Sequence, residues 1–189
     1  MSLGVSSSVE AQTTLYNETF PDTNDGWTGS AYMAPNPLNW ILSDYSTSDY
    51  CKVKSNKMEL KSGSANWESA AIDCSSYGDI QVTFSKESDH NQNAFRINVG
   101  CQGAFGSWYV LNGGGDGDYT YGESDIPDAC SGLVIRIEAS AHNNKKVKWD
   151  DVEVTGCTLQ MWYEDSDGDG YGNPSVSQSA CAQPTDYVR

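Results

Sequence analysis

The chain has 189 residues, of which 26 are Asp or Glu and 11 are Lys or Arg, so its formal net charge is −15. This charge repels phosphate backbones and anionic lipid, and the sequence shows no stripe of basic residues that would bind them, so we expect no nucleic-acid partner. Hydrophobic residues make up 38% of the chain and aromatic residues 11%, which predicts a folded core and excludes an intrinsically disordered chain.

Residues 1–14 lack the basic start and the apolar run of an export signal. We expect residues 1–3 to be an expression remnant and residues 1–14 to form a flexible N-terminal segment. No stretch approaches the roughly 18 consecutive apolar residues of a membrane-spanning helix, so no membrane span is expected.

Residues 15–156 have an all-β pattern. Short runs rich in Val, Ile, Tyr, Phe and Trp alternate with clusters of Gly, Ser, Asn and Asp. Apolar residues alternate along Ile80, Val82 and Phe84, which indicates the strand face that turns inward. The sequence therefore predicts a sandwich of two antiparallel sheets, with strands at residues 15–20, 39–42, 50–54, 57–61, 68–72, 79–85, 95–101, 107–111, 133–139 and 146–154.

Six cysteines, none of them in a C-x-x-C pair, indicate disulfides rather than a zinc site. Disulfides in turn predict an extracellular or bacterial cell-surface location. The sequence leaves the pairing open; we expect neighbours along the chain to pair, and buried free thiols in a reduced protein are the alternative. The six are Cys51, Cys74, Cys101, Cys130, Cys157 and Cys181.

Residues 157–189 form an acidic appendage that is too short to bury a core of its own. Residues 165–173 match the first nine positions of an EF-hand-type calcium loop, in which alternate side chains and one backbone carbonyl supply oxygen ligands. Val176 stands at the twelfth position, where an EF-hand has a bidentate Glu. We therefore expect a weak calcium site, with a dissociation constant of about 10⁻⁴–10⁻³ M. A flexible acidic linker is the alternative. The predicted ligands are Asp165, Asp167, Asp169, Tyr171 and Asn173.

This tail resembles a short metal-binding motif of secreted and surface proteins of environmental bacteria, and it is similar in logic to the calcium-binding type 3 repeats of thrombospondins. The resemblance rests on Trp162-Tyr163, on the Asp- and Gly-rich run that follows, and on the segment from Cys181 to Val188. Because the motif usually continues past this Tyr-Val pair, the resemblance implies that the chain ends inside a longer protein, with the metal motif truncated.

In the larger part of the chain, a second resemblance rests on residues 16–20, on Asp-Gly-Trp at 25–27 and on residues 148–154. It is a resemblance to jelly-roll modules of the galactose-binding and carbohydrate-binding type. It implies a structural calcium ion held by an acidic residue of the first strand and an Asp of the last strand, here Glu18 and Asp150. Alternation favours Asp150 over Asp151, because Asp150 should share a strand face with the valines that follow it; the alternative is that both residues start a turn.

Sugar binding requires aromatic rings with polar side chains beside them, because a pyranose presents an apolar face and a rim of hydroxyl groups. Each candidate aromatic residue also has a plain alternative as a core or cross-strand residue. The candidates are Trp67, Trp108, Tyr109, Tyr119 and Tyr121.

Three functions follow from the sequence. The first is a non-catalytic, calcium-stabilised carbohydrate-binding module within a larger secreted bacterial protein, and the second is a structural or adhesive spacer with a calcium-rigidified tail. The third is a glycoside hydrolase or lyase that uses paired carboxylates, whose separation no sequence reveals. His90 and His142 lie in polar segments without a catalytic motif nearby, so we expect no enzyme.

Overall fold

The computed structural model describes residues 11–20, 40–121 and 126–189, so the segment 1–10 and the Asp-Gly-Trp at 25–27 lie outside these ranges. Within them every regular element is a strand, which confirms the all-β prediction, and no helix is long and apolar enough to cross a membrane. The strands are β1 (Thr13–Glu18), β2 (Trp40–Val53), β3 (Met58–Ser69), β4 (Ile72–Cys74), β5 (Tyr77–Ser88), β6 (Ala94–Cys101), β7 (Ala104–Phe105), β8 (Tyr109–Val110), β9 (Gly117–Tyr121), β10 (Cys130–Thr158), β11 (Gln160–Glu164), β12 (Asn173–Ala180) and β13 (Tyr187–Val188).

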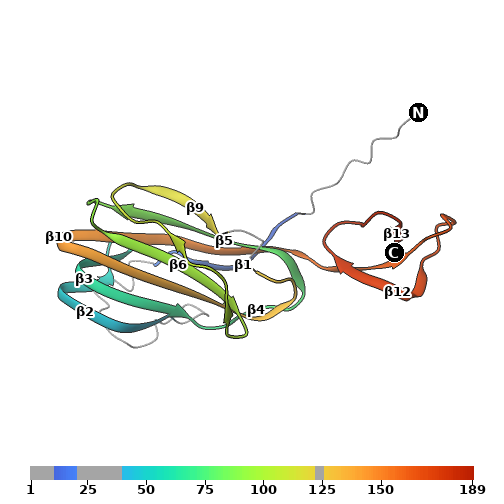
Figure 1. Ribbon diagram of the computed structural model, residues 1–189, viewed down its shortest axis with the longest axis horizontal. Coiled ribbons are helices and arrows are strands. Elements are labelled where there is room, and N and C mark those ends of the chain that lie inside the picture. The colour runs from blue at the N-terminus through green and yellow to red at the C-terminus, as the bar shows by residue number, and fades with distance from the viewer. Residues whose placement is uncertain (1–10, 21–39, 122–125) are drawn as a thin grey trace.

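Three long strands turn the same corner and so belong to both layers of the sandwich. The ladder between β3 and β10 is interrupted between Ala141 and Lys146, and the ladder between β2 and β3 shifts between Thr47 and Tyr50. At this corner Ser62 and Asn144 take the left-handed conformation, and the Asn144 N–H donates to Ser62 Oγ at 2.7 Å. Figure 1 shows both arms of β10 running back from this end.

The two layers follow from the pairing of each arm. In one layer, residues 133–140 of β10 lie between β3 and β6, and the short β7 and β8 flank β6. In the other layer, residues 147–158 of β10 pair with β5, which carries β9 at its outer edge, while β1 and the first part of β3 lie on the other side. All of these pairings are antiparallel, so the predicted two-layer antiparallel β-sandwich is confirmed.

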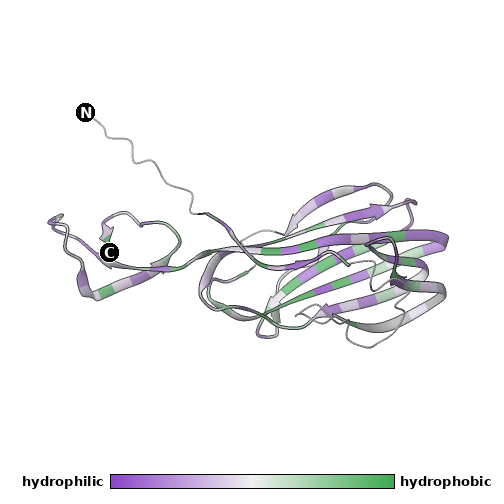
Figure 2. Cartoon of the chain, turned by 180° about the vertical axis from the view of Figure 1, so that it is seen from behind, coloured by the Kyte–Doolittle hydropathy of each residue, from purple (hydrophilic) through white to green (hydrophobic). Residues whose placement is uncertain are grey.

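Aromatic side chains fill the space between the layers. Trp67 stands edge-on to Trp149, with ring centroids 5.9 Å apart, and Trp40 lies 6.5 Å from Trp67. Phe84 stacks on Phe95 at 5.7 Å. Along the strands, hydrophobic and polar residues alternate, as Figure 2 shows, because successive side chains point to opposite faces of each layer.

The last residues form a separate three-stranded sheet in the order β12-β11-β13. It lies at the end of the sandwich opposite the corner (Figure 1). Trp162 is buried within it and donates from Nε1 to the carbonyl of Ala180 at 3.1 Å. A disulfide between Cys157, at the end of the sandwich, and Cys181 fixes the appendage to the larger sheet, as expected for a unit with so little core of its own.

Candidate functional site

A groove of about 440 Å³ crosses the outer face of the layer that contains β3, β6 and the first arm of β10. Its residues alternate with core residues along each strand, which is why they face outward: Ser64 and Asn66 flank the buried Ala65. Hydroxyl, amide and charged side chains dominate the lining. The lining residues are Ser64, Asn66, Ala94, Arg96, Val110, Asn112, Glu138, Ala139 and Ser140.

Two cross-strand ion pairs organise this face. Arg96 lies opposite Glu138 in the β6–β10 ladder and binds it, and Arg136 lies opposite Glu68 and binds it at 2.6 Å. These side chains are 29–46% exposed, so they pair in contact with water and add little to stability. Their effect is to hold two guanidinium planes and two carboxylates in fixed positions on the sheet surface, with the charges balanced.

Aromatic rings border the same face. The Arg96 guanidinium lies 4.3 Å from the centre of the Trp108 ring, and Arg136 lies 3.6 Å from that of Phe105. Phe105 in turn packs over Gly100, where a Cβ atom would come within 2.6 Å of the ring. Of the predicted aromatic residues, Trp108 therefore lies next to the groove. Tyr109 is 40% exposed, but it lies opposite the buried Ile97 and its ring stands edge-on to that of Tyr121 at 6.5 Å, so it turns away from the groove face.

The other three predicted aromatic residues are placed differently. Trp67 is 1% exposed, so its proposed role in sugar contact is corrected: it is a core residue that faces Trp149. Tyr121 is 3% exposed and donates to the Ser107 carbonyl at 2.9 Å, so it too cannot offer a ring face to a ligand. Tyr119 stacks on Phe84 at 5.6 Å in the other layer, away from the groove.

Glu18 and Asp150 come together at the edge of the core. Glu18 is fully buried and Asp150 is 7% exposed, whereas Asp151 is exposed at a bulge where its φ is +49°. Burial raises the pKa of Asp150 to about 6, and the charges of Asp151 and Glu18 act in the same direction, while the Asp151 amide and Lys57 oppose them. Asp150 Oδ1 accepts no hydrogen bond from the residues described. A cation would satisfy this oxygen.

The tail loop brings its three alternate carboxylates together. Oxygens of Asp165, Asp167 and Asp169 all lie within 4.8 Å of one another. Two oxygens on opposite sides of a calcium ion would be separated by about 4.6–5.2 Å, so this spacing fits a calcium shell. Asp165 accepts N–H bonds from Gly168 at 3.0 Å and Gly170 at 3.1 Å, and both glycines have positive φ, which shapes the loop around this carboxylate.

The two remaining predicted ligands, Tyr171 and Asn173, lie at the exposed end of this loop. The Tyr171 side chain is 81% exposed, and its N–H donates to Asp169 Oδ1 at 2.8 Å. Asn173 begins β12, and its Oδ1 accepts the Ser175 N–H at 3.0 Å. The group of converging oxygens comprises the three Asp side chains, and the roles of the Tyr171 carbonyl and the Asn173 side chain as ligands stay predictions.

The cysteines confirm two neighbouring pairs and correct the third. Disulfides join Cys101 to Cys130 and Cys157 to Cys181, whereas Cys51 and Cys74 are buried free thiols. Cys51 contacts Met58 Sδ at 4.0 Å inside the core. Cys74 lies opposite Cys130, whose sulfur is already bonded. The predicted bond between Cys51 and Cys74 is absent: β2 pairs with β3 and β4 pairs with β10, so no ladder brings the two cysteines opposite each other.

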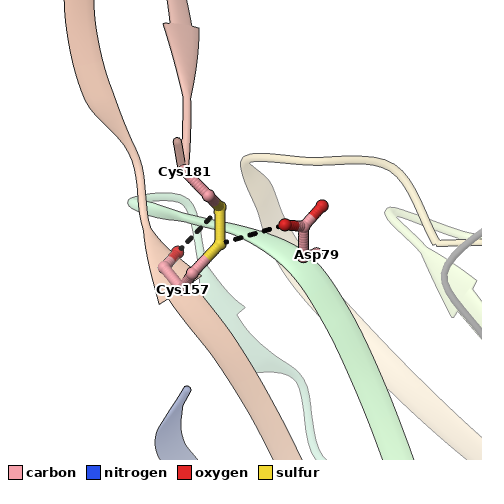
Figure 3. A group of neighbouring side chains, drawn as sticks. All are labelled: Asp79, Cys157 and Cys181. Atoms are coloured by element: carbon pink, nitrogen blue, oxygen red, sulfur yellow. Dashed lines mark hydrogen bonds between the residues drawn. A yellow bond between two sulfur atoms is a disulfide. The ribbon is translucent and has the colours of Figure 1, made fainter. Parts of the chain in front are cut away.

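Asp79 lies beside the disulfide that holds the tail. Its Oδ2 lies 3.5 Å from Cys157 Sγ, as Figure 3 shows. Three possible metal-ligand residues thus meet here, but the bond between the two sulfurs occupies both cysteines. We assign this group a structural role, the attachment of the appendage to the sandwich.

Two carboxylates lie at or near the groove, and each is engaged by an arginine. Arg96 binds Glu138, which lines the groove, and Arg136 binds Glu68 nearby. His90 and His142 stack with ring centroids 4.9 Å apart at the corner of the sandwich, a pairing that the sequence did not reveal. His90 Nδ1 accepts the Gln92 N–H at 3.1 Å within its own turn.

No family model and no curated protein matches the chain. Among solved structures, the chain is similar to one titled "CBM4 structure and function", with 14% identity, a TM-score of 0.46 and coverage of 72% of this chain and 99% of that one. The chain is also similar to a cleaved adhesin domain of Lys-gingipain from Porphyromonas gingivalis, with 11% identity, a TM-score of 0.44 and coverage of 77% of this chain and 99% of that one. A third similar structure is a family 22 carbohydrate-binding module of Clostridium thermocellum Xyn10B, with 11% identity, a TM-score of 0.43 and coverage of 76% of this chain and 92% of that one. With TM-scores below 0.5, these likenesses transfer neither ligand nor site to this chain.

Proposed function

We propose that the chain is a non-catalytic carbohydrate-binding module of a larger extracellular protein, and that a glycan lies across the outer faces of β3, β10 and β6. The groove carries the proposal, because it combines hydroxyl and amide groups with the Trp108 ring at its border. A sugar chain needs this combination, since its rings present apolar faces and its edges present hydroxyl groups. The balanced Arg–Glu pairs favour a neutral polysaccharide over an anionic one.

A panel of neutral plant, algal and bacterial polysaccharides in affinity electrophoresis tests this proposal. Trp108→Ala should weaken binding by about tenfold or more, since an aromatic contact and its buried area are lost. Arg96→Gln should weaken it as well, because it removes a fixed donor and the ring's cationic neighbour. Tyr171→Ala, which removes an exposed ring in the tail, serves as the control. Binding by none of the panel would assign the chain to the spacer function instead, whereas full binding by Trp108→Ala would show that the glycan does not lie in this groove.

Calcium is part of the proposed module, with residues 15–156 as the sandwich and residues 157–189 as a calcium loop. Asp150 and Glu18 would hold one ion at the edge of the core, where the unpartnered Asp150 oxygen supports the assignment. Asp165, Asp167 and Asp169, with the Tyr171 carbonyl and Asn173, would hold a second ion in the tail. These ions would stabilise the fold and take no part in chemistry. Two disulfides support an extracellular setting.

A further inference from the structure

The fold gathers most of the basic residues of this acidic chain on one face. Six of its 11 Lys and Arg residues come from segments 52–61 and 146–148, which are distant in sequence but become neighbours where β2, β3 and β10 pair. Along the sequence these residues form no basic stripe; the pairing of the strands brings them side by side, which corrects the expectation that the chain has none. We call Tyr50 and these lysines the lysine face: Lys52, Lys54, Lys57, Lys61, Lys146 and Lys148.

The lysine face points outward from the second layer. Residues that alternate with the lysines, such as Val53, Leu60 and Val147, are fully buried, so the lysines lie on the opposite side of the strands. The side chains of Lys57 and Lys146 are 32% and 33% exposed. The groove lies on the outer surface of the other layer, so the two faces look away from each other.

Positive charge is concentrated around one aromatic ring. The ammonium groups of Lys52, Lys61 and Lys54 lie 4.7, 5.9 and 6.0 Å from the centre of the Tyr50 ring. The Tyr50 hydroxyl donates to Glu59, which Lys146 also binds at 3.2 Å.

The carboxylates that balance this charge are partly covered. Glu59 is only 3% exposed, so solvent meets the lysines rather than this counter-charge. Glu87 binds Lys57 and also Lys148, the latter at 2.9 Å. Asp89 and Asp116 also lie beside Lys146 and Lys148, and Asp150 and Asp151 act on Lys57. Among the described residues, positive charge is therefore least offset around Tyr50, at Lys52, Lys54 and Lys61. Acidic residues elsewhere on the surface reduce the positive potential of the lysine face little, because salt screens charges that lie more than about 8 Å away under physiological conditions.

We propose that the lysine face binds an anionic polysaccharide, namely a polyuronate with a carboxylate on every sugar residue. Outward residues repeat about every 7 Å along a strand and about 5 Å across neighbouring strands, which provides a regular array of ammonium groups for a regularly charged polymer. Tyr50 supplies an aromatic surface at the centre of that array.

The surroundings of the face favour a single polysaccharide strand over duplex nucleic acid. A hollow of about 340 Å³ borders Lys146 and Lys148 and is also lined by Asp89, Asp116 and Glu87. A broad, densely charged duplex would be pressed against these carboxylates, whereas one sugar chain can follow the lysines along the strands.

Polygalacturonate binding, measured by biolayer interferometry at low and physiological salt, tests the proposal. The combined variant Lys52→Gln/Lys54→Gln/Lys61→Gln should lose about tenfold or more in affinity, with a shallower salt dependence. The control Ser76→Asp/Gln102→Glu/Gln178→Glu changes the net charge equally at exposed positions elsewhere, and it should bind within about twofold of the wild type. Melting curves of both variants verify that they fold.

Several results would overturn the proposal: no polygalacturonate binding at low salt, equal losses in both variants, or unchanged binding in the lysine variant. Tighter binding of duplex DNA would assign the face to nucleic acid. Lysine-dependent self-association in sedimentation, without polygalacturonate binding, would assign it to a second copy of the chain. Trp108→Ala should bind polygalacturonate normally, so this test and that of the groove fail independently.

Discussion

The carboxylates of Glu18 on β1 and Asp150 on β10 are both buried and repel each other at the edge of the core. The pairing of the two strands creates this arrangement, because Glu18 lies opposite Val152, two residues after Asp150. Like charges in a region of low dielectric destabilise a fold unless a cation or a proton compensates them. A calcium ion bound between the two carboxylates should therefore stabilise the fold measurably.

Calcium should raise the melting temperature through Asp150. At saturation we expect an increase of about 5–10 °C over the protein in EDTA, since a ligand that binds only the folded state stabilises it by mass action. Asp150→Asn should remove the contribution of the inner site. In EDTA this variant should be at least as stable as the wild type, because it no longer places a charge beside Glu18. Differential scanning calorimetry in an Asp167→Ala background isolates the inner site; an undiminished calcium shift in Asp150→Asn would rule out Asp150 as a ligand.

The calcium effect should depend on pH around the pKa of Asp150. This pKa is raised from 3.8 to about 6 in the folded state, so without calcium the group contributes stability at low pH that is lost as the pH rises towards 6. Calcium reverses the trend, because it binds the ionised carboxylate. The calcium-induced increase in melting temperature should thus be full above about pH 7 and fade below about pH 5. The comparison is with Asp150→Asn, whose melting temperature should lack this pH-dependent component; parallel curves for the two proteins would contradict the assignment.

The tail loop should bind calcium weakly and independently of the sandwich. Terbium luminescence, excited through Tyr171, should report a site that calcium displaces with a dissociation constant near 10⁻⁴ to about 10⁻³ M. Asp167→Ala or Asp169→Ala should abolish the signal, while Asp116→Ala, which removes a carboxylate from a loop of the sandwich, should leave it intact. A signal that survives both loop substitutions would show that terbium binds elsewhere.

The sequence predicted the strands well but divided three of them. Residues 39–42 and 50–54 are parts of β2, residues 57–61 and 68–72 overlap β3, and residues 133–139 and 146–154 are the two arms of β10. Each division falls where the strand turns the corner, because left-handed residues such as Ser62 and Asn144 interrupt the alternation there. For these strands the pattern was correct locally and lacked the information that each strand continues into the other layer. It did not predict β7, β9 or the three strands of the tail, β11, β12 and β13.

The groove illustrates what alternation can and cannot reveal. Trp67 drew attention because its neighbours are polar, but in a strand those neighbours point the opposite way. Asn66 thus lines the groove while Trp67 fills the core. Because Ala65, Trp67 and Ser69 alternate along the strand and are all small or aromatic, the sequence could have indicated that these three residues face inward together. The pairing of Arg96 with Glu138 depends on the β6–β10 register, which a single sequence does not contain.

Trp67 and Trp108 should differ sharply when each is replaced by alanine. Trp67→Ala should lower the free energy of unfolding by about 3–5 kcal/mol, since it opens a cavity between Trp40 and Trp149. Trp108→Ala, at the half-buried border of the groove, should cost less than about 1 kcal/mol. Urea denaturation at fixed calcium measures both. If Trp67→Ala kept its stability and lost glycan binding, the core assignment of Trp67 would be wrong.

Thiol titration distinguishes the observed cysteine pairing from the pairing expected at first. Burial raises the pKa of Cys51 to about 12 and that of Cys74 to about 11, so neither thiol should react readily in the native protein at pH 8. Unfolding in denaturant without reductant should expose two thiols per chain, and prior reduction should expose all six. Peptide mapping should recover the links 101–130 and 157–181. A denatured, unreduced sample with no free thiol would instead require a third disulfide between Cys51 and Cys74, and hence a different arrangement of β2 and β4.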